Sequence, residues 1–93
     1  MPITLDELPP GIPARVVGFR GPGRGAIRRL IEMGVTPGTI VVVVASIGGP
    51  VLIRVRGVLV ALGRGIARRI LVEPLHGLGF GDSNSSDKAS NTS

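Results

Sequence analysis

Apolar residues recur at helical spacing in residues 26–39, which read A-I-R-R-L-I-E-M-G-V-T-P-G-T. Ile27, Leu30 and Ile31 stand at positions i, i+3 and i+4, so they share one face of a helix, while arginines and a glutamate occupy the other faces. Gly34 follows, where helices often end with a left-handed residue. The pattern predicts a short amphipathic helix over residues 27–33 that packs on the domain through this apolar face.

After the helix the apolar period becomes that of β-strands. Thr-Pro-Gly at residues 36–38 is a turn signature, and four consecutive valines follow it within residues 39–46, which suits a strand. Residues 51–56 alternate as V-L-I-R-V-R, which places Arg54 and Arg56 together on one solvated face. The other expected strands are residues 15–19, 58–62 and 70–73, with a bulge suggested by Gly18 and a tight connection by Gly57.

Five short strands joined by tight turns leave no room for crossover helices. We therefore predict an all-β fold, a small SH3-like barrel of about five strands with one short helix inserted after the first strand. Single helical turns are expected at residues 4–8, where Thr4 and Glu7 have capping-box spacing, and at residues 66–69. The domain is expected to cover residues 1–75. Residues 76–93 are expected to form a flexible, disordered tail, because from Gly81 onward no apolar side chain is larger than that of alanine.

Composition narrows the classes of function. The chain has no cysteine, which excludes disulfides and thiolate metal sites, and its net charge is +5 with arginine as ten of its eleven basic residues. This charge points toward nucleic acid or an anionic surface, but two aromatic residues and dispersed arginines favour an ordinary solvated surface. With no run long enough to cross a bilayer and no signal-peptide pattern, we expect a cytoplasmic protein.

No catalytic constellation can be assembled from the titratable residues, so we expect a protein that is not an enzyme. His76 is the only histidine and has no cysteine or clustered carboxylate beside it, so no tightly bound metal or cofactor is expected. Residues 21–26 match the dinucleotide pattern G-x-G-x-x-A, but a parallel βαβ unit is lacking and Pro22 lies in the loop. We interpret this segment as a flexible loop.

At this point the sequence resembles the FeoA family over about residues 5–74. The most specific segment is residues 29–38, R-L-I-E-M-G-V-T-P-G, like the family's L-x-x-(L/M)-G-(L/M/V)-x-P-G. Four further segments follow in the family's order: A-S-I-G-G-P at 45–50, I-R-V-R-G at 53–57, V-A-L at 60–62 and A-R-R-I-L-V at 67–72. The chain departs from the family at Ser46, Gly49, Gly63 and Gly65, and the missing acid at position 49 argues against metal binding by that loop.

The resemblance implies an SH3-like barrel and a non-catalytic accessory role in ferrous iron uptake. The implied partner is FeoB, a membrane permease with a cytoplasmic GTPase domain, which would hold the protein at the inner membrane, with Fe²⁺ as the transported ion. One alternative is a stand-alone domain of a metal-dependent regulator, since the C-terminal domain of DtxR-type repressors is similar in fold. A less favoured alternative is a small nucleic-acid-binding barrel, and weak self-association stays open.

A surface for the partner is expected around the end of the helix. Met33 lies off the apolar stripe, so we expect an exposed and adaptable side chain beside the following turn. Arg54 and Arg56 are expected to steer an acidic partner, either with Arg64, Arg68 and Arg69 as one basic edge or as ordinary solvated charges. The predicted partner-binding residues are Met33, Val35, Pro37, Arg54 and Arg56.

Overall fold

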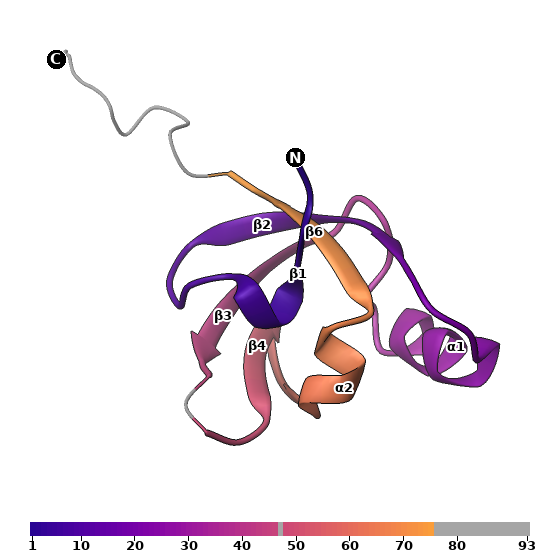
Figure 1. Cartoon of the computed structure of the whole chain (residues 1–93). Coiled ribbons are helices and arrows are strands. Elements are labelled where there is room, and N and C mark those ends of the chain that lie inside the picture. The colour runs from indigo at the N-terminus through magenta and orange to yellow at the C-terminus, as the bar shows by residue number, and fades with distance from the viewer. Residues whose placement is uncertain (47, 76–93) are drawn as a thin grey trace, which may run out of the picture.

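The computed structural model describes residues 1–46 and 48–75. Six strands form one antiparallel sheet in the order β1-β6-β2-β3-β4-β5, and Figure 1 shows the sheet curling around the interior. The strands are β1 (Ile3–Thr4), β2 (Pro13–Phe19), β3 (Ile40–Ala45), β4 (Val51–Val55), β5 (Val58–Leu62) and β6 (Ile70–Pro74). The helices are the 3₁₀ helix η1 (Leu5–Glu7) and the α-helices α1 (Arg24–Glu32) and α2 (Arg64–Ala67). The predicted all-β class with one short inserted helix is confirmed.

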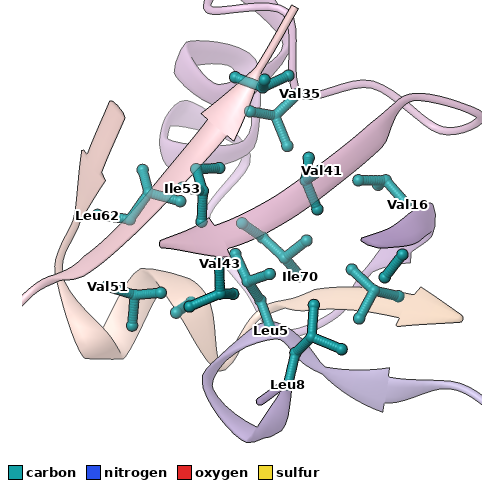
Figure 2. Close-up of a cluster of buried hydrophobic side chains, with 14 of the residues drawn as sticks. Leu5, Leu8, Val16, Val35, Val41, Val43, Val51, Ile53, Leu62 and Ile70 are labelled. Atoms are coloured by element: carbon teal, nitrogen blue, oxygen red, sulfur yellow. The ribbon is translucent and has the colours of Figure 1, made fainter. Parts of the chain in front are cut away.

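Alternating strand residues build the core. Val51, Ile53 and Val55 of β4 are buried while Arg54 between them is exposed, which is the alternation read from the sequence. Figure 2 shows the side chains of Val16, Val41, Val43, Ile53 and Ile70 converging on one interior, which Leu5 and Leu8 close beside η1. This interior is aliphatic throughout, so its stability rests on the fit of branched side chains.

Irregularities of the sheet occur at two places. The register between β2 and β6 shifts between Val16 and Gly18, which confirms the bulge expected at Gly18. A second shift, between Val43 and Ala45, interrupts the pairing of β3 with β4 and leaves Val44 exposed. The run of four valines gave no sign of this second bulge.

One strand was not predicted. β1 has two residues and pairs with β6 through Ile3↔Val72 and Thr4↔Leu71, and so short a pairing leaves no periodic pattern in the sequence. The helical turn after it was predicted. The Thr4 amide donates to Glu7 Oε1 at 3.3 Å, which confirms the reciprocal cap.

The hairpin between β4 and β5 corrects the placement of Arg56. β4 ends at Val55, and Arg56 and Gly57 have φ angles of 53° and 79°. Positive φ at both central residues makes a two-residue turn of type I′, the tight connection expected at Gly57. Arg56 therefore does not share a strand face with Arg54. It lies in the turn, and its guanidinium donates to Thr39 Oγ1 at 3.4 Å.

The assignments of residues 76–93 to a tail, of His76 to solvent and of Ile47 to a turn lie outside the described residues.

Candidate functional site

The glycine-rich loop that leads into α1 is bound by one arginine. Arg69 Nε donates to the Arg20 carbonyl at 3.0 Å, and Arg69 Nη2 donates to the carbonyls of Gly21 and Gly23 at 3.2 and 3.0 Å. The two segments are also joined through the backbone: the Arg20 amide donates a hydrogen bond to the Arg69 carbonyl at 2.8 Å. The loop that was expected to be flexible is therefore hydrogen-bonded to Arg69, which follows α2 in the chain.

The same loop makes a poor phosphate site. A Cβ at Gly21 would lie 3.1 Å from Arg69 Nε, and one at Gly23 would lie 3.3 Å from Arg69 Nη1, so glycine is needed for the close approach of Arg69. The carbonyl oxygens point at a guanidinium, whereas a pyrophosphate requires converging N–H donors. The close packing of Arg69 against Gly21 and Gly23 therefore explains why glycine occurs at both positions.

The orientation of α1 differs in part from the expectation. Leu30 is buried, Ile27 is partly buried, and Ile31 is 45% exposed, so the apolar stripe is not buried as a whole. The prediction that Ile31 packs on the barrel was wrong. In Figure 1, α1 stands at the side of the sheet with a connecting loop at each end.

A groove of about 420 Å³ lies between α1 and β5. Met33 and Leu30 contribute to one wall and Ala61 and Leu62 to the other, and Arg29 places a cation in an otherwise mostly apolar lining. The complete lining is Gly25, Ala26, Arg29, Leu30, Met33, Ala61, Leu62, Gly63 and Ile66. We call this concavity the α1–β5 groove.

A second hollow, of about 510 Å³, is lined by Met1, Ile3, Pro9, Ile12, Glu73 and Pro74. It lies at the first residue and at the last strand, next to the part of the chain that the structure does not describe. It therefore supports no argument about function.

The predicted partner residues are only partly brought together. Met33 is 45% exposed and lines the α1–β5 groove, and Pro37 is exposed in the turn that follows. Val35 is fully buried, so its side chain packs in the core and is not a contact residue. Arg54 and Arg56 are exposed, on β4 and in the adjacent hairpin turn.

The basic edge considered for five arginines does not form as one surface. Arg64 Nη2 donates to the Ser46 carbonyl at 2.6 Å, Arg69 binds the loop before α1, and Arg68 Nε lies 3.7 Å from Asp6 Oδ2. Four of the five arginines thus make contacts within the fold, since Arg56 donates to Thr39 Oγ1. Arg54 and Arg56 stay at the β4–β5 hairpin.

Arg29 and Ala61 were not foreseen as site residues. Ala61 has no chemistry that marks it in the sequence, and Arg29 stands among ten arginines. Residues 58–62 were expected as a strand, but only the structure brings α1 against β5.

Within residues 1–46 and 48–75, no group of three His, Cys, Asp or Glu side chains is placed to hold a metal ion. None of the helices in that part of the chain has the length and apolarity needed to cross a membrane.

Comparison with known proteins decides the family. The model of the FeoA domain matches residues 3–74, which cover the whole of the described sheet. The chain belongs to the FeoA family. An iron uptake regulatory protein of this family, known from its crystal structure, is 40% identical, with a TM-score of 0.72 over 81% of this chain and 99% of that one.

Two further FeoA relatives support this assignment. A Methanocaldococcus jannaschii protein, provisionally named Fe²⁺ transport protein A, is 43% identical over 51 residues, which cover 55% of this chain and 62% of that relative. The chain thus matches less than two thirds of that relative's length. The zinc complex of Stenotrophomonas maltophilia FeoA is 33% identical, with a TM-score of 0.69 over 76% of this chain and 89% of that one. That protein is described as an SH3 domain protein, in agreement with the predicted SH3-like fold.

The repressor resemblance holds at the level of the fold. A manganese-dependent transcriptional repressor has a TM-score of 0.73 and 20% identity over 80% of this chain and 42% of that one. Identity this low shows a shared fold alone.

Proposed function

We propose that this FeoA-family chain is a non-catalytic accessory component of ferrous iron uptake that acts on a FeoB-type permease from the cytoplasmic side of the membrane. Its relatives support the transport role: one is named for Fe²⁺ transport, and another is described as a candidate ferrous iron transport activating factor. Fe²⁺ is then the cargo of the permease and is not a resident cofactor of this chain.

The α1–β5 groove is the observation that carries the docking proposal. Met33 is flexible and polarizable, is 45% exposed, and lies in a mostly apolar concavity with Arg29. An apolar groove with one positive group suits an apolar side chain that is followed by a carboxylate. The hairpin arginines Arg54 and Arg56 would add attraction for an acidic surface, mainly through the association rate.

The test is binding to detergent-purified permease with its cytoplasmic domain. Met33→Asp should weaken association at least tenfold, because it places a carboxylate in an apolar contact. Ile31→Asp is the matched control, since Ile31 lies two residues before Met33 and is equally exposed at 45%, but does not line the groove. The docking proposal fails if both folded variants bind like the original chain, or if both lose binding equally.

A further inference from the structure

The outer edge of β5 is open. In the part of the chain that the structure describes, β5 ends the sheet and pairs only with β4, from Val51↔Leu62 to Val55↔Val58. In a two-residue hairpin the residues flanking the turn form a hydrogen-bonded pair, and such pairs alternate along the ladder. The amides and carbonyls of Leu59 and Ala61 therefore point away from β4, and no backbone partner for them occurs within residues 1–46 and 48–75.

This edge lacks the usual protection against strand addition. Edge strands are commonly kept short, bulged, or marked with lysine or proline. β1, at the opposite edge of the sheet, has two residues, whereas β5 reads V-L-V-A-L in unbroken register with β4. Val58 and Leu59 are 58% and 54% exposed. An apolar strand with an open edge and an unbroken register is a template for another extended segment.

Two exposed arginines lie beside the edge. Arg54 pairs with Leu59 across the ladder and shares its outward face, and Arg56 lies in the turn that starts β5. A second copy pairing through this edge would bring the Arg54 and Arg56 of both copies together, which costs free energy, whereas an acidic segment would be attracted.

We propose that the β5 edge binds an extended segment of a partner protein, in which apolar residues alternate with aspartates or glutamates, as an added antiparallel or parallel strand. The backbone of Leu59 and Ala61 supplies two donors and two acceptors, and Arg54 faces the acidic side chains. This inference rests on the proposed function in that it names the binding mode of a protein partner.

The test starts from selection of ten-residue peptides from a random displayed library against the intact chain. Enriched peptides should alternate apolar and acidic residues. Binding of the best labelled peptide is then measured by fluorescence anisotropy. Ala61→Pro removes the outward N–H while keeping the bonds to β4, because proline is tolerated where the strand N–H faces solvent. It should weaken binding at least tenfold.

Two arginine variants distinguish the effect of a charge beside β5 from the effect of the net charge of the chain. Arg54→Glu should weaken peptide binding about tenfold and reduce its salt dependence. Arg15→Glu is the control, because Arg15 is also an exposed strand residue but lies on β2, opposite Ile40 and Glu73. It should leave binding within about twofold. Circular dichroism checks folding, and Leu59→Lys replaces Ala61→Pro if the latter does not fold.

Several results would overturn the inference. The inference fails if no peptide is selected or if the enriched peptides lack acidic residues. It also fails if Ala61→Pro and Arg54→Glu bind the peptide as tightly as the original chain does. Sedimentation showing a dimer that Ala61→Pro abolishes would make a second copy the occupant, and would equally overturn it. If Met33→Asp impairs permease binding and Ala61→Pro does not, the proposed function stands and the β5 edge inference fails.

Discussion

The Val35 amide donates a hydrogen bond to the Leu30 carbonyl at 2.9 Å, and the side chains of both residues are buried. The Gly34 amide donates to the Ile31 carbonyl at 2.9 Å, so the two bonds complete a Schellman motif, with Gly34 at φ 94°. Leu30 and Val35 stand at the two positions whose apolar contact commonly accompanies this motif, and both belong to the buried core. α1 is therefore anchored to the sheet at its C-terminal end.

Truncating the Leu30 side chain should destabilise the fold, because Leu30 anchors α1 to the sheet. Leu30→Ala is expected to lower the free energy of unfolding by about 2–5 kcal/mol, because it removes a fully buried side chain and leaves a cavity. Urea denaturation measures the loss. Ile31→Ala, next to it but 45% exposed, should cost well under half as much. Equal losses would mean that the helix is rotated from the orientation described above.

The helix stop at Gly34 should not tolerate a side chain. Gly34→Ala is expected to cost about 1–2 kcal/mol from the left-handed backbone alone. Crowding adds to this, because the new Cβ would lie 3.3 Å from Arg56 Cδ. Gly38→Ala is a close control: its φ is 95°, and no atom lies within 4 Å of the added Cβ. Thermal unfolding of both variants separates backbone strain from crowding. A smaller loss for Gly34→Ala than for Gly38→Ala would contradict the contact with Arg56.

Replacing Arg69 should release the loop before α1. Lysine keeps the charge but cannot present a planar fork, so Arg69→Lys is expected to lose at least one of the three bonds to the carbonyls of Arg20, Gly21 and Gly23. The ¹⁵N relaxation of Gly21 and Gly23 should show increased mobility. Arg68→Lys serves as the comparison, since Arg68 makes an exposed 3.7 Å ion pair with Asp6. Unchanged relaxation in Arg69→Lys would show that the loop holds its conformation without the arginine.

Metal binding by the isolated chain should be weak. One histidine and no cysteine offer few ligands, and the described residues hold no cluster of three potential ligands. Calorimetry with Fe²⁺ under anaerobic conditions and with Zn²⁺ should give dissociation constants well above micromolar. Stoichiometric submicromolar binding that His76→Ala abolishes would refute this expectation.

The strands were predicted well because their burial alternates with a period of two. The helices were placed less accurately, and both errors have one cause. Gly-Arg-Gly occurs at residues 23–25 and 63–65. The helices were expected to begin after it, at residues 27 and 66, yet α1 and α2 both begin at its arginine. The first glycine is the N-cap in each case. A first-turn glycine is acceptable because the N–H groups there have no intrahelical partner to lose.

The spacing of apolar residues along the chain predicted only part of the candidate site. The exposure of Met33 was predicted correctly, but the reason was not: Met33 follows Leu30 by three residues and lines the same groove. Val35 was misjudged, because the Schellman turn folds it back into the core. The link from Arg69 to Arg20 spans 49 residues, and no local pattern reports a contact between such distant segments.

The single fully buried side chain of α1 has a consequence for hydrogen exchange. Leu30 is the one residue of α1 that reaches full burial, while β2 and β6 are paired along five positions and hold several buried side chains. Detaching the helix exposes far less apolar surface than opening the sheet does. The amides of α1 can thus exchange through a local opening that leaves the strands closed, which makes the helix a separate cooperative unit in the native ensemble.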